Sequence, residues 1–297
     1  MTEWFLILAC TVLGLAVFFL VVMVIDGNRY KAVSYELYSR KIKEPYRFVL
    51  LADLHDRCYG KNNEKLIEDI RKFNPDVVFM AGDMMTAKTG CSYHNALHLC
   101  RELTRDYPVY YSMGNHESRL FARTESYGHL WEAFERELLQ TGVILLRNRG
   151  ESRQDGLSVS GLEIDWQFYR HFKQEPMPEE YLPETLGVPD KEKYQILLAH
   201  NPDYFEDYAR WGADLVLAGH VHGGIMRLPF LGGVINPALR LFPRYDGGLF
   251  HQKDSVMILS RGLGMHTLPV RIFNPGELVL ISLKPEGHKE EEDGSVR

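Results

Sequence analysis

The chain has 297 residues, with 34 Lys and Arg against 40 Asp and Glu, and its formal net charge is −6. Apolar residues make up 45% and charged residues 25% of the chain, a balance that is typical of globular proteins and excludes wholesale disorder. The acidic composition argues against a broad basic surface, so we expect no nucleic-acid partner.

The N-terminus carries an apolar run that is long enough to cross a membrane. Residues 4–25 contain no charged side chain, and as a helix they would be about 33 Å long, against about 30 Å for a hydrocarbon core. No Lys or Arg precedes the run and no small-residue cleavage site follows it, which argues against a cleaved signal peptide. We therefore expect residues 1–29 to form one transmembrane anchor that binds the lipid bilayer through residues 4–25.

The charges on either side of the anchor indicate its orientation. Only Glu3 precedes it, whereas five basic residues follow it closely: Arg29, Lys31, Arg40, Lys41 and Lys43. The positive-inside rule then predicts a single-pass protein of the cell membrane with its large domain in the cytoplasm. Unpaired cysteines agree with that compartment, although the short N-terminal tail leaves the opposite orientation open.

Downstream of the anchor, apolar segments of two lengths alternate. A helical spacing of apolar residues predicts helices over 61–73, 93–105 and 129–139. Short apolar or alternating runs predict strands over 33–37, 47–52, 77–81, 109–113, 143–146, 157–161, 195–199, 214–218, 256–260 and 277–283. Strands that alternate with helices predict an α/β fold for one domain over residues 30–285. Residues 286–297 are charged, and we expect them to form a flexible tail.

Polar side chains gather where the expected strands end. They are Asp53, His55, Asp83, Asn115, His116, His200, His220 and His222. Strand ends at one edge of an open α/β sheet converge on one crevice, so these residues are expected to lie together. Imidazole and carboxylate groups without cysteine suit Mn, Fe or Zn ions. Glycines beside these residues permit tight turns and close backbone approach.

In this order, the motifs D-x-H, GD, GNHE, H and GHVH resemble those of the calcineurin-like metallophosphoesterase superfamily. The single anchor, the Arg-Leu-Pro after GHVHGG and the late SRGLG segment resemble its bacterial membrane-associated, YkuE-like or YaeI-like branch. The resemblance implies a four-layer α/β/β/α sandwich that holds two divalent metal ions. It divides seven ligands between two sites bridged by Asp83, with Asp53, His55 and His222 at the first and Asn115, His200 and His220 at the second.

The resemblance further implies hydrolysis of a phosphate ester by hydroxide that the metal ions activate. His116 would act as the general acid or stabilise the phosphate side, and Glu117 would fix His116. Protein phosphatases carry x-x-D-R-G after the GD motif, whereas Met-Met-Thr-Ala-Lys follows Asp83 here. A phosphodiester or pyrophosphate is therefore the expected substrate. A non-catalytic metal-binding scaffold and a nucleotide or nucleic-acid phosphodiesterase remain the alternatives. No obligate protein partner is inferred.

Candidate substrate-binding residues are four arginines: Arg57, Arg227, Arg240 and Arg244. The last three lie in residues 225–250, among the apolar Leu228, Phe230, Leu231, Leu241 and Phe242. One hypothesis is that this segment forms a wall of the pocket and binds the acyl part and phosphate of a lipid-linked substrate. The other is that its apolar residues cover the sheet. A phosphorylated small molecule is the broader expectation.

Overall fold

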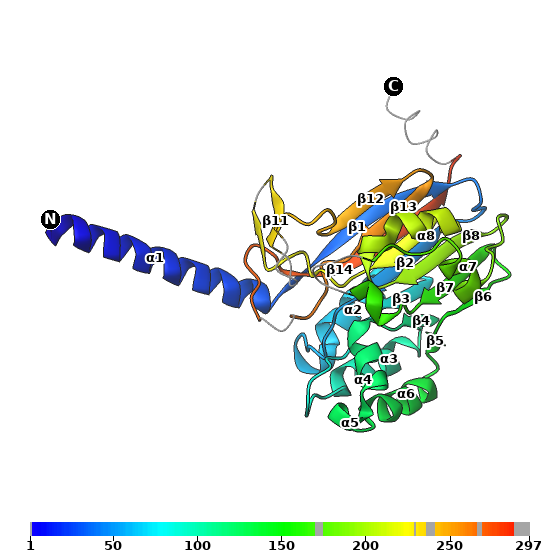
Figure 1. Cartoon of the computed structure of the whole chain (residues 1–297), viewed down its shortest axis with the longest axis horizontal. Helices are drawn as coiled ribbons and strands as arrows, with labels where there is room; N and C mark the ends of the chain where they lie inside the picture. The colour runs from blue at the N-terminus through cyan, green and yellow to red at the C-terminus, as the bar shows by residue number, and fades with distance from the viewer. Residues whose placement is uncertain (1, 170–174, 229, 236–240, 266–268, 288–297) are drawn as a thin grey trace.

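Two six-stranded sheets pack face to face, with helices on both outer faces (Figure 1). The computed structural model describes residues 2–169, 175–228, 230–235, 241–265 and 269–287. In order across the first sheet, the strands are β1 (Tyr30–Ser39), β14 (Gly276–Pro285), β2 (Tyr46–Leu51), β3 (Val77–Ala81), β4 (Val109–Ser112) and β5 (Ile144–Leu146). Across the second they are β12 (Gly248–Gln252), β13 (Ser255–Leu259), β9 (Leu215–Ala218), β8 (Tyr194–Ala199), β7 (Leu157–Leu162) and β6 (Arg149–Ser152).

The helices divide between the two outer faces. Those that follow the strands of the first sheet are α2 (Glu64–Phe73), α3 (His94–Leu103), α4 (Asn115–Ala122), α5 (Thr124–Tyr127) and α6 (Leu130–Gln140). The outer face of the second sheet packs against η2 (Trp166–Tyr169), α7 (Tyr181–Leu186), η3 (Pro202–Tyr204) and α8 (Phe205–Trp211). These layers confirm the expected α/β/β/α sandwich.

Each sheet is covered on both faces, so alternate residues of a strand are buried in different cores. In β2, Phe48 and Leu50 point into the core between the sheets, whereas Val49 and Leu51 pack against the helices. The strands of the second sheet divide in the same way between the central core and the outer helical layer. Burial on both faces is why these strands read as continuous apolar runs in the sequence.

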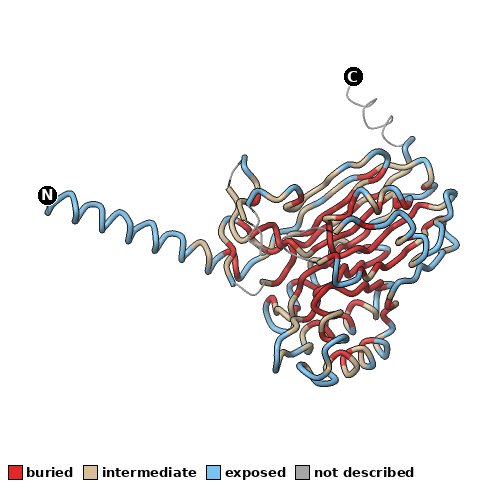
Figure 2. The backbone as a smooth tube through the Cα atoms, viewed as in Figure 1, coloured by how far each residue is buried: buried red, intermediate tan, exposed pale blue. Residues whose placement is uncertain are grey.

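The helix α1 (Thr2–Gly27) extends away from the sandwich, and its residues are exposed along most of its length (Figure 2). Its most apolar 18-residue window has a mean hydropathy of 3.0, and none of that window is buried. A helix that is apolar on all sides, and that the rest of the protein leaves uncovered, is a candidate membrane span.

The structure adds elements that the sequence patterns missed. The expected helix over 61–73 begins at Glu64, because the 3₁₀ turn η1 (Lys61–Asn63) precedes it and Asn62 and Asn63 have left-handed backbone angles (φ 55° and 60°). The short α4, α7 and α8 lack a long apolar period, and β10 (Met226–Leu228) and β11 (Gly232–Ile235) form a separate two-stranded sheet. Most of the predicted tail, residues 288–297, lies outside the described residues.

Candidate metal centre

Five strand ends meet at one edge of the sandwich. Strands β2, β3 and β4 run parallel to one another, as do β8 and β9, so each set delivers its carboxyl ends to the same edge. Backbone bonds join neighbouring ends: Asp53 N–H donates to Gly82 O at 3.0 Å, and Gly219 N–H donates to His200 O at 3.1 Å. The topology thus brings together the polar residues that the sequence placed on separate strands.

Five of these residues have left-handed backbone conformations that are rare for residues other than glycine. They are Asp53, His55, Asp83, His220 and His222, with φ between 49° and 76°. Such conformations cost about 1–3 kcal/mol each and persist only where the surroundings enforce them. Their concentration at one edge of the sheets indicates that the fold holds these side chains in position for a purpose other than stability.

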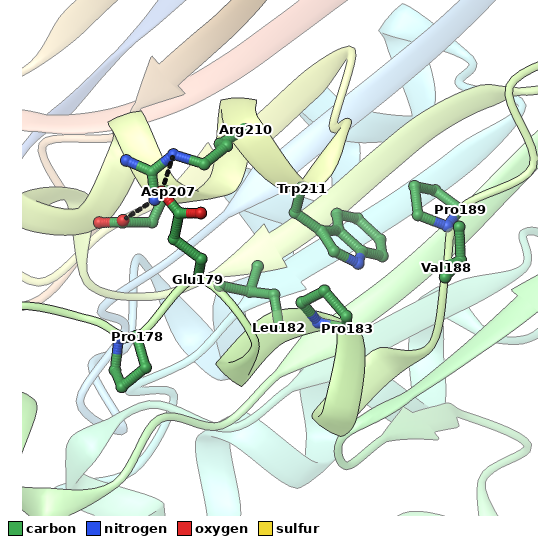
Figure 3. Close-up of a pocket in the computed structure, with 9 residues that line it drawn as sticks. All are labelled: Pro178, Glu179, Leu182, Pro183, Val188, Pro189, Asp207, Arg210 and Trp211. Atoms are coloured by element: carbon green, nitrogen blue, oxygen red, sulfur yellow. Dashed lines mark hydrogen bonds and ion pairs between the residues drawn. The ribbon is translucent and has the colours of Figure 1, made fainter.

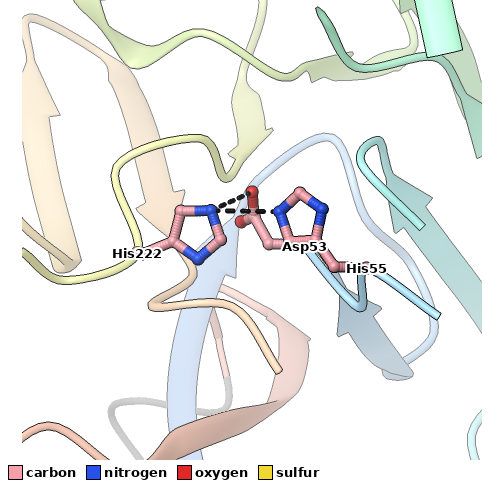
Figure 4. A group of neighbouring side chains, drawn as sticks. All are labelled: Asp53, His55 and His222. Carbon is pink, nitrogen blue, oxygen red and sulfur yellow. Dashed lines mark hydrogen bonds and ion pairs between the residues drawn. The ribbon is translucent and has the colours of Figure 1, made fainter. Parts of the chain in front are cut away.

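The first cluster consists of Asp53, His55 and His222 (Figure 4). Nε2 of His222 lies 3.3 Å from Oδ1 of Asp53 and 3.2 Å from Nε2 of His55. Asp53 is fully buried, and the backbone N–H of His220 donates to its two oxygens at 3.0 and 3.1 Å. Burial raises the pKa of Asp53 to about 7, since its charge lacks the stabilisation that water would give.

Asp83 lies between two groups of ligand atoms. It belongs to one group with His55 and His116 and to another with His200 and His220, and within each group the atoms lie within 4.8 Å of one another. Burial would raise the pKa of Asp83, but the neighbouring His200 and His116 rings hold it well below its usual value. Asp83 is thus the residue that these two groups of ligand atoms share.

Hydrogen bonds on Nδ1 orient two of the histidine rings. Nδ1 of His55 lies 3.1 Å from Met85 O, and Nδ1 of His200 lies 2.7 Å from Ala81 O. A carbonyl oxygen only accepts, so both Nδ1 atoms carry the proton and Nε2 is left to bind a proton or a metal ion. Burial alone would lower the pKa of His200, but the nearby carboxylates of Asp83 and Asp53 raise it to about 10. The cluster therefore attracts positive charge.

Two buried polar atoms fit a metal ion as their missing partner. Among the described residues, Oδ1 of Asn115 and Nε2 of His200 have no hydrogen-bond partner, although Nε2 of His200 lies 3.1 Å from Oδ2 of Asp83. Buried polar atoms are nearly always hydrogen-bonded, so such atoms need an explanation. Oxygen and imidazole donors around paired carboxylates are a ligand set for Mn, Fe or Zn. The residues present thus fit divalent metal ions.

His116 has the opposite tautomer to His55 and His200. The backbone N–H of Ala87 donates to Nδ1 of His116 at 2.8 Å, so the proton of the neutral ring is on Nε2, which lies 3.9 Å from Oδ2 of Asp83. Burial lowers the pKa of His116, which favours the neutral ring. Its geometry makes His116 a hydrogen-bond donor toward the site, in contrast to His55 and His200.

Glu117 joins the two loops that carry Asp83 and Asn115. Its Oε2 accepts from the backbone N–H groups of Asp83 and Gly114 at 2.9 and 3.0 Å. Its Oε1 accepts from the N–H of Met85 and the hydroxyl of Tyr111 at 3.0 and 2.8 Å. The sequence predicted that Glu117 fixes the His116 ring, whereas these four bonds instead fix the backbone of the ligand loops.

Glycines let the backbone approach the carboxylates closely. A Cβ on Gly219 would lie 2.5 Å from Oδ2 of Asp53, and one on Gly262 would lie 2.7 Å from its Cβ. Gly262 also has a φ of +69°, which larger residues rarely adopt. Any side chain at these positions would displace Asp53.

Two residues outside the predicted set hold the ligand loops in place. Nδ2 of Asn274 donates to the carbonyl oxygens of His222 and Gly224, both at 2.7 Å. The buried Arg271 donates to the backbone carbonyls of Arg261, Gly262, Gly264 and Asn274, including Gly262 O at 3.1 Å. The sequence patterns did not predict a role for Arg271. Nothing in the sequence around Asn274 indicated its contacts.

Three of the four candidate arginines have partners within the protein. Arg57 Nη2 donates at 2.9 Å to Oδ1 of Asn28, the residue that follows α1. Arg227 Nη1 donates to the Gly223 and Asp246 carbonyl oxygens at 3.0 and 2.8 Å. Arg244 pairs with Glu206 of α8 at 2.7 Å. Arg240 lies outside the described residues. A role of these arginines in substrate binding stays a prediction.

A pocket of about 110 Å³ lies between α7 and α8, on the outer face of the second sheet (Figure 3). Leu182, Trp211 and several prolines line it, and among its charged residues Arg210 pairs with Asp207 at 2.8 Å and with Glu179 at 3.9 Å. None of the seven candidate ligands is among its lining residues. The chemistry of the strand ends therefore belongs to a separate place in the molecule.

Comparison with known proteins identifies the family. The sequence profile of the calcineurin-like phosphoesterases matches residues 46–224, which contain all seven candidate ligands. The chain belongs to this family. It is 25% identical over 245 residues to the Bacillus subtilis protein named uncharacterized metallophosphoesterase YkuE, covering 80% of this chain and 79% of that one. The resemblance expected from the motifs is confirmed.

Two further relatives show how widely the domain is shared. An uncharacterized metallophosphoesterase of Campylobacter jejuni is 26% identical over 263 residues, covering 86% of this chain and 63% of its own. A Danio rerio protein named transmembrane protein with metallophosphoesterase domain is 26% identical over 264 residues, covering 86% of this chain and 57% of its own. Family and clustered Asp and His residues together support a metal-dependent phosphoesterase.

Proposed function

We propose that the protein is a membrane-anchored phosphoesterase that uses two divalent metal ions to hydrolyse phosphodiester or pyrophosphate bonds. The observation that carries the proposal is the convergence of the ligand atoms, with two buried atoms, Oδ1 of Asn115 and Nε2 of His200, that have no hydrogen-bond partner among the described residues. The residues proposed to hold the ions are Asp53, His55 and His222, Asn115, His200 and His220, and the bridging Asp83. When bound, two such ions lower the pKa of a shared water molecule and withdraw charge from the phosphoryl oxygens.

His116 is proposed to stabilise the phosphate rather than to transfer a proton. Because Nδ1 accepts from Ala87 N–H, a second ring proton would break that bond, and the ring stays neutral with its proton on Nε2. A neutral imidazole gives up that proton very poorly, so its contribution is a fixed hydrogen bond toward a phosphoryl or leaving-group oxygen. Removal of one such fixed donor typically slows a reaction by about 10²–10³-fold.

The apolar α1 supports a substrate that reaches the enzyme from the bilayer. We propose a lipid-linked phosphodiester or pyrophosphate, whose phosphate would approach the metal centre while its acyl chains stay in the membrane. Basic residues after α1, including Arg29 and Lys31, favour the cytoplasmic side for the domain. The exposed apolar residues of the segment after the H-x-H motif are consistent with lipid nearby.

The proposal is tested with the full-length protein in lipid nanodiscs. Wild type should hydrolyse bis(p-nitrophenyl) phosphate with added Mn²⁺ and contain two metal ions per chain. Asp83→Ala should lose both, whereas Asp155→Ala, a control in the turn between β6 and β7 where Asp155 pairs with Arg153, should retain both. Fewer than two ions without turnover in the wild type would favour the non-catalytic scaffold. Full activity of Asp83→Ala would contradict the proposed centre.

A further inference from the structure

A small sheet connects the end of α1 with the metal centre. Its core is the pair β10 and β11, and Met226 of β10 forms a bridge with Ile272 on one side. On the other side, Phe242 N–H donates to Val234 O of β11 at 2.9 Å. We call residues 225–228, 230–235, 241–242 and 270–274 the basal sheet, and Figure 1 shows β11 at the end of the molecule from which α1 extends.

The basal sheet exposes most of the large apolar side chains of the domain. Outside α1, nine large apolar residues among those described are exposed. Five of them belong to the basal sheet: Phe230, Leu231, Leu241, Phe242 and Phe273. The other four are scattered over separate elements: Phe121, Leu139, Trp166 and Val188. Single exposed apolar residues are ordinary, but a gathered set marks a surface that an apolar partner covers.

Contacts with α1 identify that partner. The Phe273 ring lies 6.3 Å from the ring of Phe18 and 6.4 Å from that of Phe19, well inside the apolar run. From Trp4 to Phe18 the helix rises only about 21 Å, which is less than the roughly 30 Å of a hydrocarbon core. A bilayer that α1 spans must therefore extend past Phe18, and Phe273 lies at a depth that lipid occupies.

The depth of Phe273 along α1 and the basic residues after α1 agree with a position at the membrane–water interface. From Phe18 to Ile25 the helix rises about 10 Å, similar to the roughly 5–10 Å to which apolar side chains enter the headgroup and acyl boundary. Arg29 and Lys31 are exposed directly after α1, at the level where lipid headgroups would begin. Basic residues at that level are favourable beside anionic lipids.

We propose that the basal sheet inserts its apolar side chains into the bilayer interface beside α1, and so holds the metal centre against the membrane surface. The inference rests on the membrane anchoring proposed above. The orientation is fixed because Asn274 makes two contacts at once: its backbone N–H donates to Asp26 Oδ2 at 3.0 Å, and its Nδ2 donates to His222 O. A single residue, Asn274, thus links the end of α1 to the loop that carries the candidate metal ligand His222.

The test measures the depth of single labels on the full chain in nanodiscs of phosphatidylcholine and phosphatidylglycerol. Cys10, Cys58 and Cys91 are replaced by serine, while Cys100 stays, because burial raises the pKa of its thiol to about 12 and keeps it unreactive. A thiol-reactive NBD fluorophore is then placed at one position at a time. Lipids that carry a doxyl quencher near the headgroup or deep in the acyl chain report its depth.

Four positions give the answer. Labels on Phe230→Cys and Phe242→Cys should shift to the blue and be quenched by the headgroup-level doxyl lipid. A label on Val188→Cys, which replaces another exposed apolar residue between α7 and β8, should stay aqueous. A label on Leu13→Cys in the middle of α1 reports whether the anchor is inserted. All four substituted side chains are exposed, and unchanged thermal unfolding of each variant verifies its fold.

The outcomes separate the two proposals. Quenching at positions 13, 230 and 242 without quenching at 188 supports the insertion of the basal sheet. Quenching at 13 alone overturns it and leaves the anchoring intact. No quenching at 13 contradicts the anchoring itself, and the insertion of the basal sheet with it.

Discussion

Replacement of Glu117 by glutamine tests whether its carboxylate holds the ligand loops together. The substitution keeps the size of the side chain and replaces one acceptor oxygen by an NH₂ donor. In the most favourable orientation, the remaining oxygen accepts from Asp83 and Gly114, and the NH₂ group faces Met85 N–H and the Tyr111 hydroxyl. The hydroxyl can rotate and accept, but the Met85 N–H loses its partner.

The loss of these hydrogen bonds sets how much Glu117→Gln lowers the free energy of unfolding. A hydrogen bond to a charged group contributes about 1.5–3 kcal/mol, and a buried donor without a partner costs about 1–3 kcal/mol. Removal of a buried charge offsets part of this sum, so we expect the free energy of unfolding to fall by about 3 kcal/mol. For a domain of this size, that corresponds to a decrease in Tm of roughly 6–12 °C. Loosened loops should also reduce metal affinity by about 10–100-fold.

The assay is thermal unfolding together with Mn²⁺ titration of the full-length protein. The control is Glu137→Gln on the surface of α6, where Oε1 accepts one hydrogen bond from the Tyr93 hydroxyl at 2.9 Å. That change should cost less than about 1 kcal/mol and leave metal binding unchanged. If Glu117→Gln unfolds at the wild-type temperature and binds Mn²⁺ equally well, the carboxylate does not hold the loops as inferred.

Three further substitutions address other parts of the site. His116→Ala should slow turnover by about 10²–10³-fold with unchanged metal content. His116→Gln, whose amide can still donate, should retain more activity. If His116→Ala instead loses more activity on esters with poor leaving groups than on esters with good ones, His116 acts as a general acid. Gly262→Ala should reduce metal content and stability, because the added methyl group would meet Asp53; wild-type metal content would contradict this. Asn274→Ala should lower the free energy of unfolding by about 1–3 kcal/mol through two lost bonds to the H-x-H turn, whereas an unchanged unfolding curve would show that these bonds are dispensable.

The candidate ligands could be found from the sequence because each follows a strand that has a strong local pattern. Apolar runs such as 77–81 and 215–218 are buried on both faces, and the polar residue after each run marks where the strand leaves the core. The order of the motifs then identified the family and, through it, the sandwich. Short helices were missed because α4 and α8 are positioned by the loops and sheet around them rather than by a long period of their own.

The sequence by itself indicated the longer buried strands, the candidate ligand residues and the apolar N-terminal helix, since each depends on residue type and local spacing. Only the tertiary structure decided which hydrogen bonds orient them. The ring orientation of His116 depends on Ala87, the loops depend on Glu117, and the link from α1 to the metal centre passes through Asp26 and Asn274, which are 248 positions apart. Contacts over such separations follow from the packing of the whole chain, because no local pattern specifies which distant donor a buried oxygen will meet.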